Sequence, residues 1–328
     1  MNTRKIGQAT VSALGLGCMN LSHAYGTPPD AATAETLLLR ALDLGVTHFD
    51  TAALYGFGAN ETLVGKVLSS HRDKIFLASK CGMTGVDGKR VIDGRPATLR
   101  RTCDEALKRL RTDRIDLYYL HRWDRQVPIE ESVGGLSRLV EEGKILGIGL
   151  SEVSADTLRR AHAEHPVAAL QSEYSLWTRN PEIATLEACR ELGTAFVAFS
   201  PLGRGFLSGA LNDVSRLEEK DIRRQMPRFE AETFARNLPL LDGLQKLAKK
   251  ADATPAQLSL AWLLALDDNI LPIPGTTSLP HLEENLGAVD MQLEGTLLQE
   301  LDRLINRHSV IGARYNAATQ SEIDTEEF

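Results

Sequence analysis

The sequence predicts an α/β fold, a (β/α)8 TIM barrel, and three observations support that class. Eight short apolar runs alternate along the chain with segments of helical periodicity, as they do in barrels of parallel strands. Three successive apolar runs end in Asp50, Lys80 and His121, and the carboxyl ends of barrel strands all face one pocket. The second candidate, a doubly wound sheet, would carry GxGxxG after its first strand, and residues 15–20 lack the third glycine.

The first half of the chain predicts a hairpin, four strands and four helices. Residues 4–12 alternate in polarity, which favours a small hairpin over the bottom of the barrel. Asp30 can cap the N-terminus of a helix, and Gly45 can end that helix. Pro96 marks the start of a later helix, and Gly143 closes the one after it. The strands are expected at 13–19, 46–50, 75–79 and 115–120. The helices are expected at 31–44, 60–69, 96–111 and 128–143, with a glycine-rich loop at 82–94.

The second half continues the alternation to an eighth strand. Pro181 and Gly193 bound one helix, and Thr254 can cap another. Residues 200–236 have too little apolar periodicity for a core element and predict a functional loop, whose arginine-rich part at 216–228 is expected to be solvated. The strands are expected at 145–150, 167–170, 195–199 and 270–273. The helices are expected at 154–164, 181–193, 237–250, 254–266, 278–288 and 295–307.

Composition narrows the class of protein. The 328 residues would allow two domains, but α/β barrels reach this length as one. We therefore expect a single barrel domain over 1–328, with a long loop near 200–236 and a C-terminal helix and tail. The net charge of −7 argues against nucleic acid or an anionic membrane as a partner. The four cysteines form no CxxC pair and no signal-peptide pattern occurs, so a reduced, cytoplasmic protein is expected.

The residues at the strand ends form a chemically meaningful group. Taken singly, each of these residues has an ordinary structural explanation. Asp50 could cap a helix, and Lys80 could be a solvated surface residue. Tyr55 could pack in the core, and His121 could be a buried histidine with hydrogen-bond partners. Together, Lys80 and Asp50 predict a partly buried ion pair, and the ammonium is expected to lower the pKa of the Tyr55 phenol. A phenol tuned towards neutrality can protonate a carbonyl oxygen that His121 holds by a hydrogen bond. The sequence contains no metal-binding spacing such as HExxH.

These motifs resemble the aldo-keto reductase superfamily, and the resemblance runs from Gly15 to Gly287. Members carry an Asp–Tyr–Lys–His tetrad, and the matching positions here are Asp50, Tyr55, Lys80 and His121. The segments at 172–177 and 312–315 look like the bacterial and plant branch, whose members are monomers or weak oligomers. The resemblance implies a TIM barrel that reduces a small-molecule aldehyde or ketone with NADPH, with NAD as the alternative cofactor. Tyr55 would protonate the carbonyl oxygen, and His121 would orient the substrate.

The same resemblance implies where cofactor and substrate would lie. The positions that match the family's cofactor-binding residues, from the nicotinamide through the pyrophosphate loop to the adenosine, are Gly17, Cys18, Met19, Asp50, Ser151, Gln171, Phe199, Ser200, Pro201, Leu202, Gly203, Arg204, Gly275, Thr276, Thr277, Ser278, His281, Glu284 and Asn285. Glu152 replaces an asparagine that many relatives carry at this site. The loops above the same face would shape the substrate pocket with Tyr25, Leu54, Phe57, Met83 and Trp123. Packing at the barrel rim is an equal alternative for Trp123.

Two other functions fit the same residues. One is a nicotinamide-binding regulatory subunit. The other is a Schiff-base aldolase with Lys80 as its nucleophile, which the predicted ion pair with Asp50 disfavours. Many relatives place a lysine or arginine after the Pro-Gly-Thr of strand eight, where this chain has Thr277 and Ser278. We therefore expect a preference for NADPH that is weaker than in those relatives.

Overall fold

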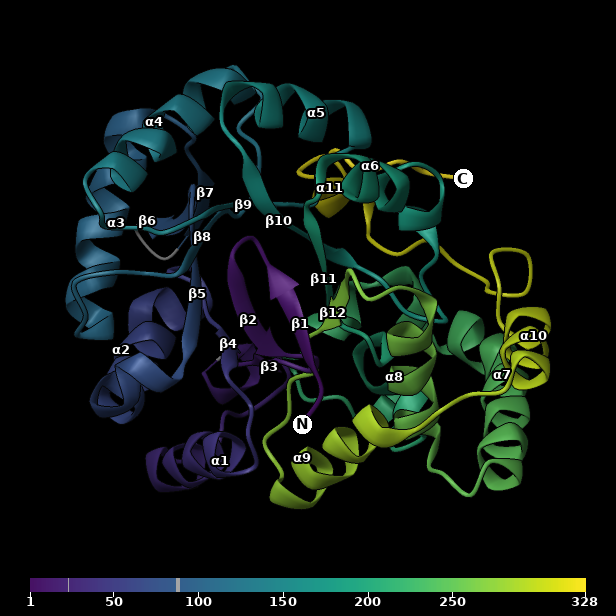
Figure 1. Ribbon diagram of the computed structural model, residues 1–328. Coiled ribbons are helices and arrows are strands. Elements are labelled where there is room, and N and C mark those ends of the chain that lie inside the picture. Colours follow the sequence, from purple (N-terminus) through teal and green to yellow (C-terminus); the bar gives the residue numbers. More distant parts are fainter. Residues whose placement is uncertain (23, 87–88) are drawn as a thin grey trace.

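The protein is a barrel of parallel strands surrounded by helices (Figure 1). A computed structural model describes residues 1–22, 24–86 and 89–328. Among these residues the central sheet has eight strands, ordered β3-β4-β5-β8-β9-β10-β11-β12. The strands are β3 (Leu16–Gly17), β4 (His48–Asp50), β5 (Phe76–Cys81), β8 (Leu117–Leu120), β9 (Ile148–Ser151), β10 (Val167–Glu173), β11 (Ala195–Phe199) and β12 (Ile270–Pro272). The predicted fold class is confirmed.

The barrel closes where the first strand meets the eighth. The amide of Gly15 donates to the carbonyl of Pro272 at 3.0 Å, and that of Gly17 donates to the carbonyl of Pro274 at 3.1 Å. Both glycines are needed for this close approach. A Cβ on Gly15 would lie 2.9 Å from Cγ2 of Ile273, and one on Gly17 would lie 2.9 Å from the carbonyl oxygen of Ile273.

The helices form a ring outside the strands (Figure 1). The ring helices are α1 (Ala31–Asp43), α2 (Ala59–Leu68), α3 (Pro96–Leu110), α4 (Ile129–Glu141), α5 (Ala155–Glu164), α6 (Thr185–Leu192), α8 (Pro255–Leu266) and α9 (Leu279–Leu286). Asp30 caps α1 by accepting from the amide of Thr33 at 2.8 Å. Thr254 and Gln257 form a capping box at α8, because each side chain bonds the other residue's amide. Among the described residues, no helix is long and apolar enough to cross a membrane.

The apolar core has two layers, one inside the barrel and one between the sheet and the helices. The interior layer includes Tyr119 and Leu271 and is covered from below by Ile6 and Val11. These two residues belong to the predicted hairpin, β1 (Thr3–Ile6) and β2 (Ala9–Ser12), which lies across the ring in Figure 1. Arg4 fixes the hairpin to the barrel by donating to backbone carbonyls between Leu264 and Ile270.

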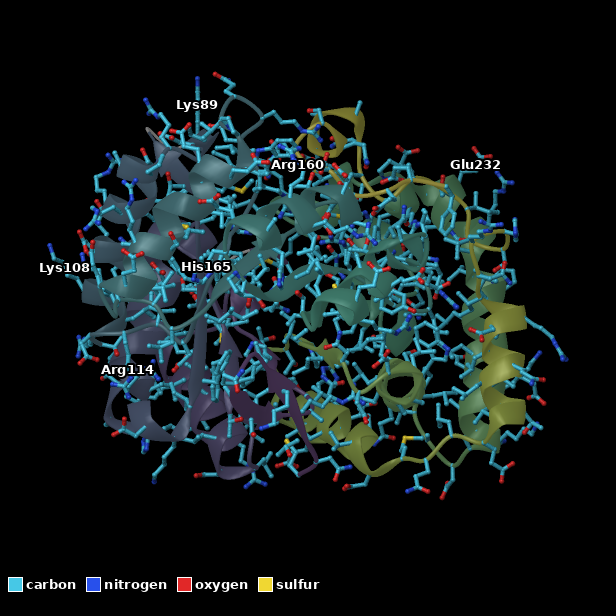
Figure 2. The ribbon with its side chains drawn as sticks, turned by 45° about the horizontal axis from the view of Figure 1, so that its top comes forward. Lys89, Lys108, Arg114, Arg160, His165 and Glu232 are labelled. Atoms are coloured by element: carbon cyan, nitrogen blue, oxygen red, sulfur yellow. The ribbon has the colours of Figure 1, made fainter. Side chains whose placement is uncertain are left out.

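The loops at the opposite end differ more from the predictions. The glycine-rich loop contains a second hairpin, β6 (Met83–Val86) and β7 (Lys89–Ile92), and positions 87–88 of that loop lie outside the described residues. Figure 2 shows Lys89 of this hairpin pointing away from the molecule. The loop after β11 contains short 3-10 segments and ends at α7 (Ala231–Lys250), which begins six residues before the predicted start at 237. α7 packs against α10 (Gly295–Leu304).

The C-terminal segment, residues 311–327, includes α11 (Ala317–Gln320) and is bonded to the start of α5. One carboxylate oxygen of Asp324 accepts from the hydroxyls of Ser154 at 2.9 Å and Thr157 at 2.6 Å, at the start of α5. Glu326 accepts from the amide of Ala155 at 2.7 Å. Helix N-termini in a barrel lie at the end where strands terminate, so these bonds hold the segment against the face that bears the strand ends. The sequence identified this region only as a polar tail.

Candidate active site

The four residues of the predicted tetrad converge at the carboxyl ends of β4, β5 and β8. Asp50 is the last residue of β4, Lys80 lies in β5 and His121 directly follows β8. Tyr55 lies in the turn after β4. The parallel pairing of these three strands brings side chains that are far apart in sequence to one place.

Lys80 lies at the centre of this group and is fully buried. Its ammonium pairs with one carboxylate oxygen of Asp50, and donates to the Thr51 carbonyl at 2.9 Å and to the Tyr55 hydroxyl oxygen at 3.1 Å. The side-chain amide of Gln171 donates to the second oxygen of Asp50 at 2.8 Å. Burial is the largest influence and would lower the pKa of Lys80, but the interactions with Asp50 and Tyr55 together outweigh it and raise the pKa. Lys80 is therefore a fixed positive charge beneath the Tyr55 phenol.

The pKa of Tyr55 moves in the direction opposite to the prediction. Burial raises it above its ordinary value, and the Lys80 ammonium opposes that rise without reversing it. The physical reason is that the phenolate loses its hydration, while the positive charge of Lys80 is already shared with Asp50. In the ligand-free protein Tyr55 is a neutral phenol and so carries the proton that an acid catalyst needs.

His121 is a neutral imidazole at neutral pH. Burial, together with the nearby charges of Arg122 and Lys80, places its pKa well below the ordinary value. Its ring meets the Tyr55 ring edge to face, with centroids 5.9 Å apart. Within the described residues its Nδ1 has no hydrogen-bond partner. A neutral histidine here can donate one N–H to an oxygen bound beside the phenol.

A cavity of about 830 Å³ opens above the tetrad. It extends from the nicotinamide positions to the adenosine positions that the resemblance implied. The residues predicted from the sequence that line it are Gly17, Met19, Tyr25, Asp50, Leu54, Tyr55, Met83, His121, Ser151, Gln171, Phe199, Ser200, Pro201, Leu202, Arg204, Gly275, Thr276, Thr277, His281, Glu284 and Asn285. Among the described residues, no cluster of histidine, cysteine or carboxylate side chains could hold a metal ion.

Three of the predicted cofactor positions do not line the cavity. Cys18 is fully buried, and its thiol points to the carbonyl of Leu16. Gly203 lies beneath the lining, where a Cβ would come within 3.0 Å of the Trp177 ring. Ser278 caps α9 by accepting from the amide of His281, so its hydroxyl is used within the protein.

Two of the predicted pocket residues also lie elsewhere. The Phe57 side chain is 58% exposed, and its ring lies against Gly85 of β6. Trp123 packs at the rim, since its indole N–H donates to the carbonyl of Val127 at 2.9 Å and the Arg160 guanidinium lies 5.8 Å from its ring centroid. The packing alternative for Trp123 is therefore the one that the geometry supports.

The cavity also contains residues that sequence reasoning missed. These are chiefly Arg90, Arg122, Arg223, Tyr315, Asn316 and Thr319. Arg122 follows His121 directly, and Tyr315 lies in one of the motifs that resemble the family, so both positions carried a usable signal. The expectation that 216–228 is solvated holds for Arg216 and Arg224, which are exposed, but not for Arg223 and Arg228. Arg223 pairs with Asp221 at 2.6 Å, and Arg228 donates to the carbonyl of Trp177 at 2.6 Å.

A buried ionic cluster, formed by Glu152, Glu173, Arg204 and Arg314, holds the loop after β11 and the C-terminal segment together. Arg204 pairs with Glu173 at 2.6 Å and donates to the Tyr315 hydroxyl at 3.0 Å. Arg314 pairs with Glu152 at 2.9 Å. Glu152 therefore faces the C-terminal segment, away from the cavity, which explains why this chain accepts an acid at that position.

Comparison with known proteins finds one family over most of the chain. Residues 13–306 match the family model described as the aldo/keto reductase family. The NADP(+) aldo-keto reductase yakc of Schizosaccharomyces pombe is 45% identical over 328 residues, which cover 98% of this chain and 96% of that protein. The probable aldo-keto reductase 1 of Glycine max is 46% identical over 308 residues, covering 93% of this chain and 88% of that protein.

Solved structures share the fold over nearly the full chain. Glycerol dehydrogenase of Gluconobacter oxydans aligns with a TM-score of 0.85 at 28% identity, covering 95% of this chain and 97% of that one. An aldo/keto reductase of Klebsiella pneumoniae, solved in complex with NADP and acetate, aligns with a TM-score of 0.73 at 28% identity. That alignment covers 96% of this chain and 98% of the other.

Proposed function

Because the chain belongs to the aldo/keto reductase family, we propose that it reduces aldehyde or ketone carbonyls to alcohols with NADPH, in a reversible reaction. The observation that carries this proposal is the position of Tyr55. Its hydroxyl lies 3.1 Å from the Lys80 ammonium and faces the cavity beside a neutral His121. A protonated phenol, a fixed cation and a neutral imidazole form a site suited to protonating a carbonyl oxygen.

The donor set of the cavity fits a nicotinamide dinucleotide. Ser151 and Gln171 would hold the carboxamide, Phe199 would stack on the nicotinamide ring, and the loop at 200–205 would cover the pyrophosphate. Thr276 and Asn285 lie at the adenosine end. Bound NADPH would supply the hydride for the carbonyl carbon. The yeast relative is named for NADP(+) and the Klebsiella structure contains NADP, which supports this choice over NADH.

In this proposal the side chains handle only the carbonyl oxygen and its proton. His121 donates an N–H to the oxygen and orients the carbonyl. Tyr55 transfers its phenolic proton to the same oxygen as negative charge develops there, and an alcohol results. The phenolate that remains is stabilised by Lys80 and regains a proton from solvent. In the reverse direction Tyr55 removes the proton from the alcohol.

The geometry disfavours the Schiff-base aldolase. A nucleophilic lysine must lose its proton, but Asp50 raises the pKa of Lys80 and the ammonium is buried behind Tyr55. The regulatory alternative would be supported by a protein that binds NADPH without turnover.

All four cysteines are unpaired and buried, which fits our proposal that the enzyme works in the reducing cytoplasm as a monomer or weak oligomer.

The test of the proposed function is Tyr55→Phe. Loss of the proton donor should lower kcat/KM for a reactive aldehyde by roughly 100- to 10,000-fold, while binding of NADPH is retained. NADPH oxidation measures the first quantity, and quenching of protein fluorescence on titration with NADPH measures the second. Tyr118→Phe is the matched control, because Tyr118 lies in the layer between sheet and helices and its loss of a hydroxyl should leave turnover unchanged.

A Tyr55→Phe variant with wild-type turnover would show that the phenol is not the acid. Tight binding of NADPH with no turnover on any aldehyde, quinone, keto-sugar or keto-steroid would favour the regulatory role.

A further inference from the structure

Arg122 has a place in the cavity that the proposed mechanism does not use. It follows His121 in the chain and lines the cavity. Its Nη1 donates to the carbonyl of His121 at 2.7 Å and to the hydroxyl of Ser151 at 3.2 Å. Its Nε is buried and has no hydrogen-bond partner in the described part of the chain, and Nη2 makes no hydrogen bond there either. One edge of the guanidinium is therefore fixed by the protein, and the other, Nε with Nη2, is unused.

Arg122 also differs from the other arginines that line the cavity. Arg204 pairs with Glu173, Arg223 pairs with Asp221 and Arg90 pairs with Glu322. Arg122 makes no ion pair with any described carboxylate. Asp124, two positions along the chain, accepts from backbone amides, and Glu152, next to the Ser151 that Arg122 contacts, pairs with Arg314. The cavity thus contains a positive charge that no carboxylate among the described residues balances.

This charge lies close to the reacting groups. Arg122 contributes to the lowered pKa of His121 and acts in the same direction on the phenol of Tyr55. A substrate whose carbonyl oxygen contacts Tyr55 and His121 therefore has its neighbouring atoms within the electrostatic range of Arg122.

On the basis of the proposed function, we propose that the substrate is a carbonyl compound that also carries a carboxylate, and that Arg122 binds this carboxylate. Nη2 makes no hydrogen bond to the described residues, and it can donate a charge-assisted hydrogen bond to a carboxylate oxygen. A single guanidinium balances one negative charge. A phosphate would call for a second free cation, and Arg90 is already tied to Glu322 at the rim.

The test compares a series of ω-oxo carboxylic acids of increasing chain length with their methyl esters. The quantity measured is the ratio of kcat/KM for each acid to that for its ester, with NADPH saturating. In the wild type this ratio should exceed one and peak at the chain length that spans the distance from Tyr55 to Arg122. Arg122→Met should lower the peak ratio by roughly 10- to 100-fold, and Arg122→Lys should retain part of it. Added salt should weaken the preference of the wild type.

Arg160→Met is the matched control. Arg160 lies on α5, labelled in Figure 2, where it pairs with Glu130 and does not line the cavity. Its loss removes the same charge from the same side of the barrel, and the acid-to-ester ratio should not change.

A binding measurement separates recognition from catalysis. Calorimetric titration of the NADP(+)-loaded protein with the matching ω-hydroxy acid should give a dissociation constant roughly 10-fold or more weaker in Arg122→Met. Equal ratios in the wild type and Arg122→Met, with reduction of the esters that still requires Tyr55, would overturn this inference and leave the proposed function standing. Failure of the wild type to reduce any acid or ester would overturn the proposed function itself.

Discussion

At the scale of single residues, the ion pair of Asp50 and Lys80 controls both stability and chemistry. Lys80→Met leaves the buried Asp50 carboxylate with Gln171 as its remaining hydrogen-bond partner among the described residues. Breaking a buried ion pair in this way should lower the free energy of unfolding by about 3–5 kcal/mol. The double variant Asp50→Asn/Lys80→Met, which carries neither charge, should recover part of that loss. Urea denaturation of the two single variants, the double variant and the wild type measures the coupling. Additive losses would show that the pair contributes no coupling energy.

Residues at the adenosine end give a second prediction at this scale. Thr277 and His281 line the cavity where the 2′-phosphate of NADPH would lie, and Glu284 adds an acid there. With no lysine or arginine at positions 277 and 278, we expect only a modest preference for NADPH over NADH. Thr277→Lys should raise the ratio of kcat/KM with NADPH to that with NADH by roughly 10-fold or more.

A ratio below one in the wild type would make NADH the natural donor. A ratio that Thr277→Lys does not change would show that residue 277 does not face the phosphate.

The positions of the site residues could be predicted from the sequence, but the direction of their pKa shifts could be predicted less well. Asp50, Tyr55, Lys80 and His121 could be predicted because each occurs at a strand end, and parallel strands end on one face. The direction of the pKa shift of Tyr55 could not be predicted, because it depends on how deeply the phenol is buried. Burial is a property of the packed structure, and spacing along the chain does not report it.

At the scale of elements, α2 and α3 approach each other closely at Gly65 of α2. A Cβ there would lie 2.6 Å from Cα of Leu110 at the end of α3, and closer still to the carbonyl oxygen of Arg109. Gly65→Ala should therefore lower the free energy of unfolding by about 1–3 kcal/mol through overpacking. Gly295→Ala at the start of α10 is the matched control, since its Cβ would meet nothing within 4 Å. Chemical denaturation of both variants measures the difference, and equal stability would show that α2 can shift away from α3.

The bounds of helices and strands that are marked by a capping residue or a clear apolar period could be predicted to within a few residues. The capped helix α1, for example, was expected at 31–44 and spans Ala31–Asp43. β10 extends to Glu173, three residues beyond the predicted 170, because its pairing with β11 continues that far. The early start of α7 has a similar cause, since Phe234 in its first turns packs on aromatic rings from elsewhere in the chain. Helix and strand ends that depend on such partners are not encoded in local periodicity.

At the scale of the whole molecule, the buried ionic cluster should make stability depend on pH. Burial raises the pKa of Glu173, but Arg204 and Arg314 lower it by more, so its pKa in the folded protein is below the ordinary 4.5. A depressed pKa stabilises the folded state above the pKa of the unfolded chain, and this contribution is lost as the pH falls through the folded value. The free energy of unfolding should therefore decrease as the pH falls below about 4.5.

The variant Glu173→Gln tests this dependence. It should be less stable than the wild type at neutral pH, because Arg204 loses its buried partner, and its stability should fall less on acidification. Glu232→Gln, on the exposed face of α7 labelled in Figure 2, should follow the wild-type curve. Urea denaturation at several pH values measures all three proteins. Parallel curves for Glu173→Gln and the wild type would exclude Glu173 as the group responsible.

Contacts of this kind explain why the path of the C-terminal segment could not be predicted from the sequence. Arg314 and Glu152 are 162 positions apart, and nothing near either residue marks the other as its partner. The strands converge by a general rule of the barrel, whereas the path of this segment depends on individual pairings. Tyr315 and Thr319 enter the cavity through those pairings alone.

The seam between β3 and β12 has a consequence for the order of events during synthesis. Residues 15–17 leave the ribosome early, yet the carbonyls that complete their hydrogen bonding belong to Pro272 and Pro274. Until those residues emerge, the growing sheet has two open edges that can pair with other chains. Closure of the seam removes both edges at once, so we expect the nascent chain to be most exposed to aggregation just before residue 274 is released.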